Sequence, residues 1–84
     1  SPNPFNPQTV IEYELPRAAH ARLRVHDLRG RLVATLVDGQ QSAGRHTATW
    51  RATGPRHATL PSGAYLLRLE AAGEVRTARV TVLK

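Results

Sequence analysis

The feature that most constrains the fold is the stretch 21–37, two apolar segments separated by a single glycine, Gly30. In the first segment Leu23 and Val25 alternate with arginine and histidine, which places apolar side chains on one face of an extended chain. In the connection, Asp27 can accept a hydrogen bond from a backbone N–H two residues on, and Gly30 can adopt the left-handed conformation that closes a short loop. The glycine and the β-branched residues around it disfavour a helix. The stretch therefore predicts a β-hairpin.

The rest of the chain repeats this alternation of apolar and polar residues, with turn-forming residues between the repeats. The further strands expected are Thr9–Leu15, Arg45–Ala52, Gly63–Ala71 and Val75–Leu83, and the connections expected are Asp38–Gly44, Thr53–Ser62 and Ala72–Glu74. Strands without a helix predict an all-β fold, an antiparallel sandwich, and the absence of cysteine means that packing alone must hold it. The core anchors expected are Tyr13, Leu23, Val25, Trp50, Tyr65 and Leu67. On the last strand, Ala78, Val80 and Val82 are expected to point inward.

The N-terminal arm, residues 1–8, differs from the body that follows it at 9–84. It contains Pro2, Asn3, Pro4, Phe5, Asn6 and Pro7. Proline fixes φ and restricts the residue before it, so the arm is expected to be extended. Phe5 either docks against the body or is exposed, and burial of a Phe side chain, worth on the order of 2 kcal/mol, favours docking. The pattern leaves open whether the arm would dock on its own chain or on another.

The charge of the chain is strongly basic, with a formal net charge of +6. The arginines are spread over strand faces that should be solvated, and they form no cluster of the kind that reads nucleic-acid sequence. Specific nucleic-acid binding is therefore not predicted, whereas weak contact with anionic glycans or lipopolysaccharide is. No run approaches the roughly 20 apolar residues of a membrane span, so no transmembrane segment is predicted.

The residues that could carry chemistry do not form a catalytic pattern. The four histidines, His20, His26, His46 and His57, have no metal-ligand spacing on one element. Ser42 and Ser62 lie in glycine-containing loops, but no G-x-S-x-G elbow surrounds either serine. Glu12 and Glu14 share one strand face without a partner nearby, which is typical of surface charge. We predict no catalytic residue, no metal site, no cofactor and no enzyme activity.

The order of short motifs along the chain resembles a known family. The motifs are PNPFNP at 2–7, TVIEYELP at 9–16, LRVHDLRGRLVATLV at 23–37, GRHTATW at 44–50, LPSGAYLLRL at 60–69 and VTVLK at 80–84. Together they cover nearly the whole chain. They resemble the type A C-terminal sorting domain of the type IX secretion system and the similar immunoglobulin-like domain of the flagellar hook-capping protein. The resemblance implies an Ig-like β-sandwich of about six to seven strands.

The resemblance also implies a function and a place in the cell. It implies a non-catalytic module of a secreted or surface-exposed bacterial protein that the secretion machinery recognises at the outer membrane. The residues that match the recognition motifs are Gly63, Tyr65, Val80, Val82, Leu83 and Lys84. An alternative from a structural class is a subunit of an extracellular filament, surface layer or hook-cap-like scaffold, in which neighbouring copies join by strand pairing. Both hypotheses require protein partners.

Overall fold

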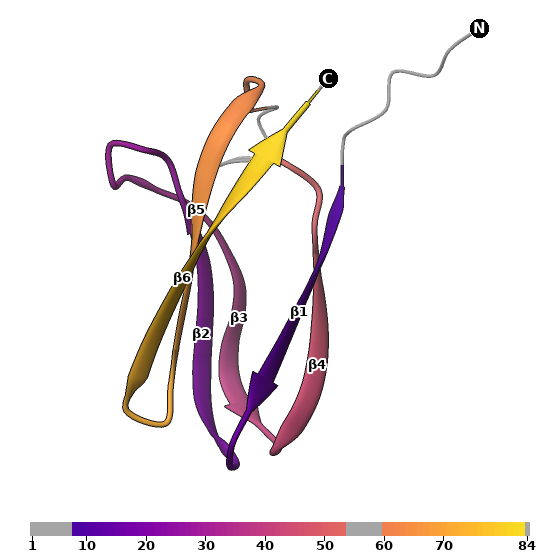
Figure 1. Ribbon diagram of the computed structural model, residues 1–84, viewed down its shortest axis with the longest axis vertical. Helices are drawn as coiled ribbons and strands as arrows, with labels where there is room; N and C mark the ends of the chain where they lie inside the picture. Colours follow the sequence, from indigo (N-terminus) through magenta and orange to yellow (C-terminus); the bar gives the residue numbers. More distant parts are fainter. Residues whose placement is uncertain (1–7, 54–59, 84) are drawn as a thin grey trace, which may run out of the picture.

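The computed structural model describes residues 8–53 and 60–83, which form two antiparallel β-sheets (Figure 1). The strands are β1 (Thr9–Leu15), β2 (Ala19–His26), β3 (Leu32–Gln41), β4 (Gly44–Trp50), β5 (Gly63–Ala71) and β6 (Glu74–Val82). One sheet has the order β1-β4 and the other has the order β3-β2-β5-β6. This confirms the all-β antiparallel sandwich. The predictions for residues 1–7, for His57 and for Lys84 lie outside the described residues.

The hairpin predicted around Gly30 is present, and its loop is organised by Asp27. The backbone N–H groups of Arg29 and Arg31 each donate to the Asp27 carboxylate over 2.9 Å, and the Asp27 N–H donates to the Arg31 carbonyl. Gly30 has φ +87°, in the left-handed region that side chains with a Cβ rarely adopt. These hydrogen bonds stabilise the carboxylate, so the pKa of Asp27 lies below its usual range, with the Arg31 backbone bond as the largest cause.

The second strand of the hairpin corrects one prediction. Asp38 and Gly39 were expected to start a turn, but β3 continues through both of them to Gln41. The strand is maintained because Asp38 lies opposite Arg22 in the ladder and also binds His20, so its carboxylate has partners on β2 and need not fold back on its own backbone. The reversal comes after Gln41 instead, and β4 begins at Gly44 with φ +110°.

Two register shifts explain why β3 shows no clean alternation in the sequence. The register along β2 and β3 shifts between Leu23 and Arg24 and again between Val25 and His26. Leu36 and Val33 are the extra residues at these shifts, so each side chain is half-buried beside a half-buried neighbour. The hairpin therefore contributes apolar surface to the core without strict alternation on β3.

The core lies between the sheets and is centred on Trp50, Leu23 and Val25, which are the largest fully buried side chains. The Trp50 indole packs edge-on against the Tyr65 ring with centroids 5.4 Å apart, and its N–H donates to the Thr53 carbonyl over 3.4 Å. Four of the six expected anchors, Leu23, Val25, Trp50 and Tyr65, are buried in this core, and the other two, Tyr13 and Leu67, are half-buried against it. Burial of each large apolar side chain contributes about 1.5–3 kcal/mol.

The last strand, β6, is covered less than predicted. Val82 is buried and Val80 is half-buried. Ala78 lies on the same inward face, opposite Leu67, as predicted, but it is exposed because nothing in the described part of the chain covers it. The reason is the strand count. The two-stranded sheet is narrower than the four-stranded sheet, and most of the inner face of β6 extends beyond it. The sandwich is therefore open along the side where β1 and β6 form the edges.

Candidate functional site

The predicted recognition residues that lie within the described ranges, all but Lys84, come together at one end of the sandwich. In the β5–β6 ladder Gly63 lies opposite Val82, and Tyr65 lies opposite Val80. Two motifs that are separated by more than ten residues in the chain are thus direct cross-strand neighbours. Leu83 follows the end of β6 and is 75% exposed. The end of β6 therefore presents an apolar side chain to solvent above a fixed strand pair.

The two residues on β5 position this end and do not offer side chains to a partner. The Tyr65 ring is buried against Trp50, and its hydroxyl donates to the Pro61 carbonyl over 2.7 Å. Gly63 has φ +149°, and a Cβ built there would meet nothing within 4 Å. The glycine is required by backbone conformation and not by lack of space. Together they fix where the chain enters β5 opposite the end of β6.

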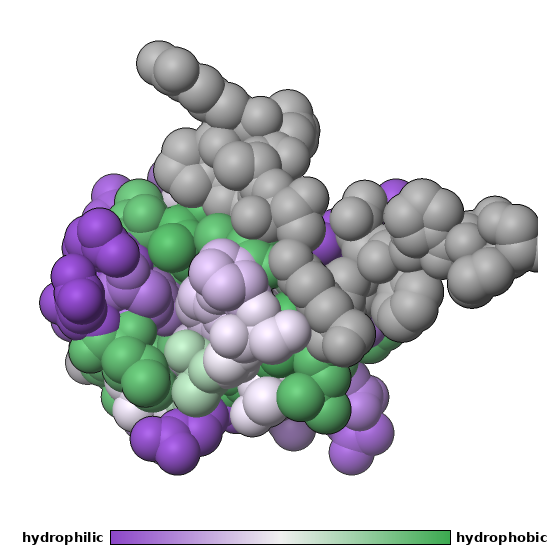
Figure 2. All heavy atoms as spheres, turned by 90° about the horizontal axis from the view of Figure 1, so that it is seen from above, coloured by the Kyte–Doolittle hydropathy of each residue, from purple (hydrophilic) through white to green (hydrophobic). Residues whose placement is uncertain are grey.

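A surface hollow beside this end was not predicted from the sequence. Its volume is about 660 Å³, and its walls come from the hairpin loop 27–31, the start of β3 and the segment that leads into β5. Leu28 on the loop and Leu32, the first residue of β3, are exposed, and Arg29 and Arg31 lie beside them. Figure 2 shows hydrophobic side chains gathered next to hydrophilic ones at this end of the molecule. The sequence held one signal of this hollow, Leu28 between Asp27 and Arg29. A large apolar residue in a tight loop cannot reach the core and is left exposed on the surface.

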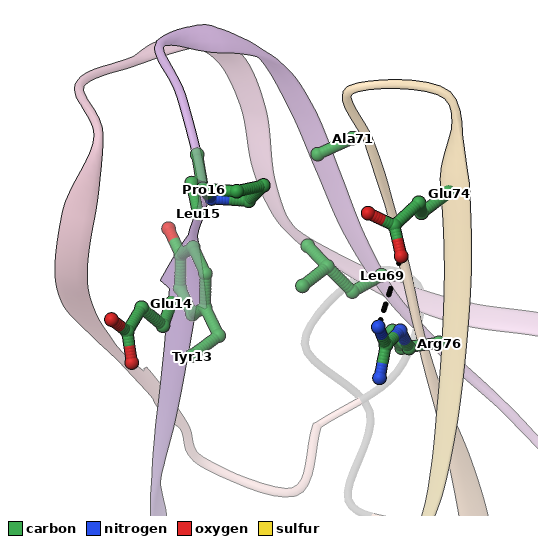
Figure 3. Close-up of a pocket in the computed structure, with 8 residues that line it drawn as sticks. All are labelled: Tyr13, Glu14, Leu15, Pro16, Leu69, Ala71, Glu74 and Arg76. Carbon is green, nitrogen blue, oxygen red and sulfur yellow. Dashed lines mark hydrogen bonds and ion pairs between the residues drawn. The ribbon is translucent and has the colours of Figure 1, made fainter.

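A second hollow lies on the open side of the sandwich, between β1 and the β5–β6 hairpin (Figure 3). Its volume is about 470 Å³, and it is lined by Tyr13, Glu14, Leu15, Pro16, Leu69, Ala71, Glu74 and Arg76. Glu74 and Arg76 form an ion pair of 2.9 Å at its rim. Tyr13 donates to the Gln41 side chain over 3.1 Å, and burial raises the pKa of its phenol. The hollow therefore has apolar walls and, at its rim, an ion pair whose two charges cancel.

The outer face of the four-stranded sheet is basic. Arg22, Arg24, Arg68 and Arg79 alternate with the inward residues of β2, β5 and β6 and therefore lie on the outward face. Two carboxylates offset part of this charge. Glu70 pairs with Arg24 and Arg68, and Asp38 pairs with Arg22 and with His20, whose ring nitrogen is 2.6 Å away. The His20 hydrogen bond is the main reason that the pKa of Asp38 lies below its usual range.

The other candidate groups have structural surroundings. His46 stacks on Tyr13 with centroids 5.3 Å apart and donates to the Ser42 carbonyl over 2.8 Å. His26 donates to the Gly30 carbonyl in the hairpin loop. Ser42 and Ser62 are exposed, as are Glu12 and Glu14. In the ranges 8–53 and 60–83, no group of three or more His, Asp or Glu side chains is placed to hold a metal ion.

Comparison with known proteins places the chain in a family. Residues 6–74 match the family model described as the FlgD Ig-like domain. The chain belongs to the FlgD Ig-like domain family. The fold is also found in a solved structure, the FlgD crystal structure from P. aeruginosa, with a TM-score of 0.73 at 20% sequence identity. The match covers 92% of this chain and 62% of that chain, so the chain spans less than two thirds of the solved FlgD structure. No curated protein matches.

Membership of the FlgD Ig-like family settles the coarse features of this chain. The family is a non-catalytic, Ig-like β-domain, which agrees with the antiparallel sandwich described above. No helix within the described ranges is long and apolar enough to cross a membrane. The family match ends at Glu74, the first residue of β6. The predicted recognition residues from Val80 onward therefore lie beyond the matched segment.

Proposed function

We propose that this domain is a non-catalytic sorting or anchoring module of a secreted or cell-surface bacterial protein, recognised by the type IX secretion machinery. The observation that carries the proposal is the pairing of Gly63 with Val82 and of Tyr65 with Val80, followed by the exposed Leu83. A motif that another protein recognises needs a rigid structural base and an accessible contact. The buried Tyr65 and the paired β5 and β6 supply the rigid base, and the exposed side chain of Leu83 supplies the accessible contact.

The test is a reporter protein fused ahead of residues 1–84 and expressed in a bacterium that has the type IX machinery. The fusion is expected to reach the cell surface. Leu83→Asp should reduce the surface fraction several-fold while leaving the domain folded, because the side chain is exposed. Leu28→Asp is the matched control, since it also places a charge on an exposed leucine but lies on the hairpin loop. Equal surface fractions for the two variants would contradict the assignment of recognition to the end of β6.

A second candidate function is a structural role in an extracellular assembly joined by strand pairing. The observation that favours it is that β1 pairs only with β4, and β6 only with β5, within the described part of the chain. Unpaired strand edges can add a strand from another chain. Open-ended assembly predicts filaments of the purified chain by electron microscopy, and their absence at high protein concentration would count against this function.

The basic outer face of the four-stranded sheet favours one further, weak contact, with anionic glycans or lipopolysaccharide. Arg22 and Arg79 are exposed on this face, and the arginines on it outnumber its carboxylates. Such attraction is electrostatic and is screened over about 8 Å at physiological ionic strength. Binding to lipopolysaccharide should therefore fall steeply with added salt and should weaken in Arg79→Ser. Binding that is independent of salt would contradict an electrostatic contact.

A further inference from the structure

The open side of the sandwich has two unpaired strand edges of opposite charge character. The outward face of β1 carries Glu12 and Glu14, and β1 has no basic residue. The outward face of β6 carries Arg79 and no acidic residue. Both edges border the same hollow, because Tyr13–Pro16 on one side and Glu74 with Arg76 on the other line it together (Figure 3). The chain therefore contains two complementary edges on one side.

We propose that this open side binds a second copy of the same chain, with β1 of each copy pairing with β6 of the other in a closed twofold dimer. The two strands run in opposite directions, β1 towards the bottom and β6 towards the top of Figure 1. A twofold axis parallel to the strands preserves these directions. It places β1 beside the partner's β6 as an antiparallel neighbour, and β6 beside the partner's β1 at the same time. Each sheet then continues into the partner's other sheet, and both edges are closed.

Two constraints narrow the register. The inward residues of β1 must lie opposite inward residues of β6, because a shift by one residue would turn every side chain to the wrong face. A twofold axis along the strands also keeps each residue at its own level, and the shared hollow puts Leu15 at the level of Arg76 and Glu74. Pairing Leu15 with either Arg76 or Glu74 satisfies both constraints and gives every residue of β1 a partner within β6. We choose Leu15 with Arg76 because that register also places Glu12 opposite Arg79, whereas the other places Glu12 opposite Thr77.

In this register the side chains that lie opposite each other are complementary on both faces of the sheet. On the inner face Ile11 lies opposite Val80, and Tyr13 lies opposite Ala78, which is exposed in the single chain and would be covered in the dimer. On the outer face Glu12 lies opposite Arg79, and the twofold axis repeats the pair. The alternative pairing of β1 with itself would place acidic residues of the two copies together, which is unfavourable. The like net charge of +6 on each copy opposes association at long range, so the dimer is expected to be weak.

Charge reversal and restoration test the interface on the purified 84-residue chain. Sedimentation at about 0.15 M salt, where the screening length is roughly 8 Å, should show a concentration-dependent monomer–dimer equilibrium. Glu12→Arg and Arg79→Glu should each weaken the dimer on the order of tenfold, since each creates two like-charged cross-strand pairs. The double variant should recover the affinity of the original chain. Arg51→Glu, an exposed reversal after β4 and outside the proposed interface, is the control and should leave the dimer intact.

Crosslinking tests the register directly, because the chain has no cysteine of its own. Glu12→Cys with Arg79→Cys should form a disulfide-linked dimer on mild oxidation. Thr47→Cys with Arg79→Cys is the matched control, because Thr47 is the neighbour of Glu12 on β4, one strand farther from the edge, and it should not crosslink. Within one chain positions 12 and 79 point out of opposite sheets, so a bond between them has to join two copies.

Three results would overturn the proposal. The first is a chain that stays monomeric at millimolar concentration. If such a chain dimerises only after residues 1–7 are deleted, the proposal also fails, because the arm and not a second copy would then occupy the open side. The second is a dimer that neither reversal weakens. The third is growth beyond two copies, because a closed twofold contact leaves neither edge free. All of these readouts are made without the secretion machinery, so they remain distinguishable from failure of the sorting proposal.

Discussion

Removal of the Trp50 side chain is the perturbation for which the structure gives the clearest magnitude. The ring is 2% exposed, lies at the centre of the core and packs edge-on against Tyr65. Replacement of a buried Trp by Ala typically costs about 3–5 kcal/mol, from lost burial and the cavity that remains. A chain of 84 residues has a total stability of about 4–13 kcal/mol at typical values per residue. Trp50→Ala should therefore lose about a quarter or more of the total stability and unfold at a clearly lower urea concentration than the original chain.

Trp50→Phe separates burial from the specific contacts. Phe keeps an aromatic ring against Tyr65 but loses the second ring and the N–H bond to Thr53, so it should cost about 1–2 kcal/mol, less than the alanine variant. The assay is urea unfolding followed by far-ultraviolet circular dichroism, because these variants remove the only tryptophan and its fluorescence. Val10→Ala, on a side chain that is 58% exposed, is the control and should change stability by less than about 0.5 kcal/mol. A loss below about 1 kcal/mol for Trp50→Ala would refute the placement of this ring at the core.

The remaining predictions concern turns and charge. Gly63→Ala should destabilise the domain by about 1–2 kcal/mol, because φ is +149° at this position. Gly39→Ala is the control and should have little effect, because no positive φ is required there. Equal losses of stability in urea unfolding would contradict this reason. Ala72→Asn should stabilise by about 0.5–1 kcal/mol, because Ala72 has φ +53° in the two-residue β5–β6 turn, where Asn is favoured, and an unchanged or lower melting temperature would refute it. The pKa of Asp38 is lowered by His20 and Arg22, so its stabilising contribution is complete above the unfolded pKa of about 3.8 and is lost as pH falls through the lower, folded value. Asp38→Asn should therefore flatten this part of the curve of stability against pH. A curve identical to that of the original chain would contradict the pairing.

The strands and the first turn could be predicted from the sequence because their signals are local. Alternation over β1, β2 and β4 fixes which side chains face the core, and Asp27 with Gly30 specifies its loop through hydrogen bonds within five residues. The Asp38-Gly39 turn was predicted wrongly because the competing partners, His20 and Arg22, are remote in the chain. A turn signal in sequence says nothing about a carboxylate that a neighbouring strand can bind.

The candidate site was predictable only in part, for a related reason. Its members on β5 and β6 were expected from motifs, but their cross-strand pairing depends on register, which only the fold supplies. The open side depends on how many strands each sheet has, and alternation along one strand does not determine that number. One signal was present: the inward positions of β6 begin with Glu74, Arg76 and Ala78, which are poor core residues. This composition is typical of a strand face that the other sheet does not cover.

The most direct measurement of the central claim is the fraction of a reporter protein that reaches the cell surface when it carries this domain at its C-terminus. If the domain is a module that other proteins recognise, the reporter should become accessible to protease on intact cells that have the type IX machinery and remain protected in cells that lack it. A fused domain that is folded, as judged by resistance to protease after lysis, but that leaves the reporter inside both kinds of cell would contradict the account.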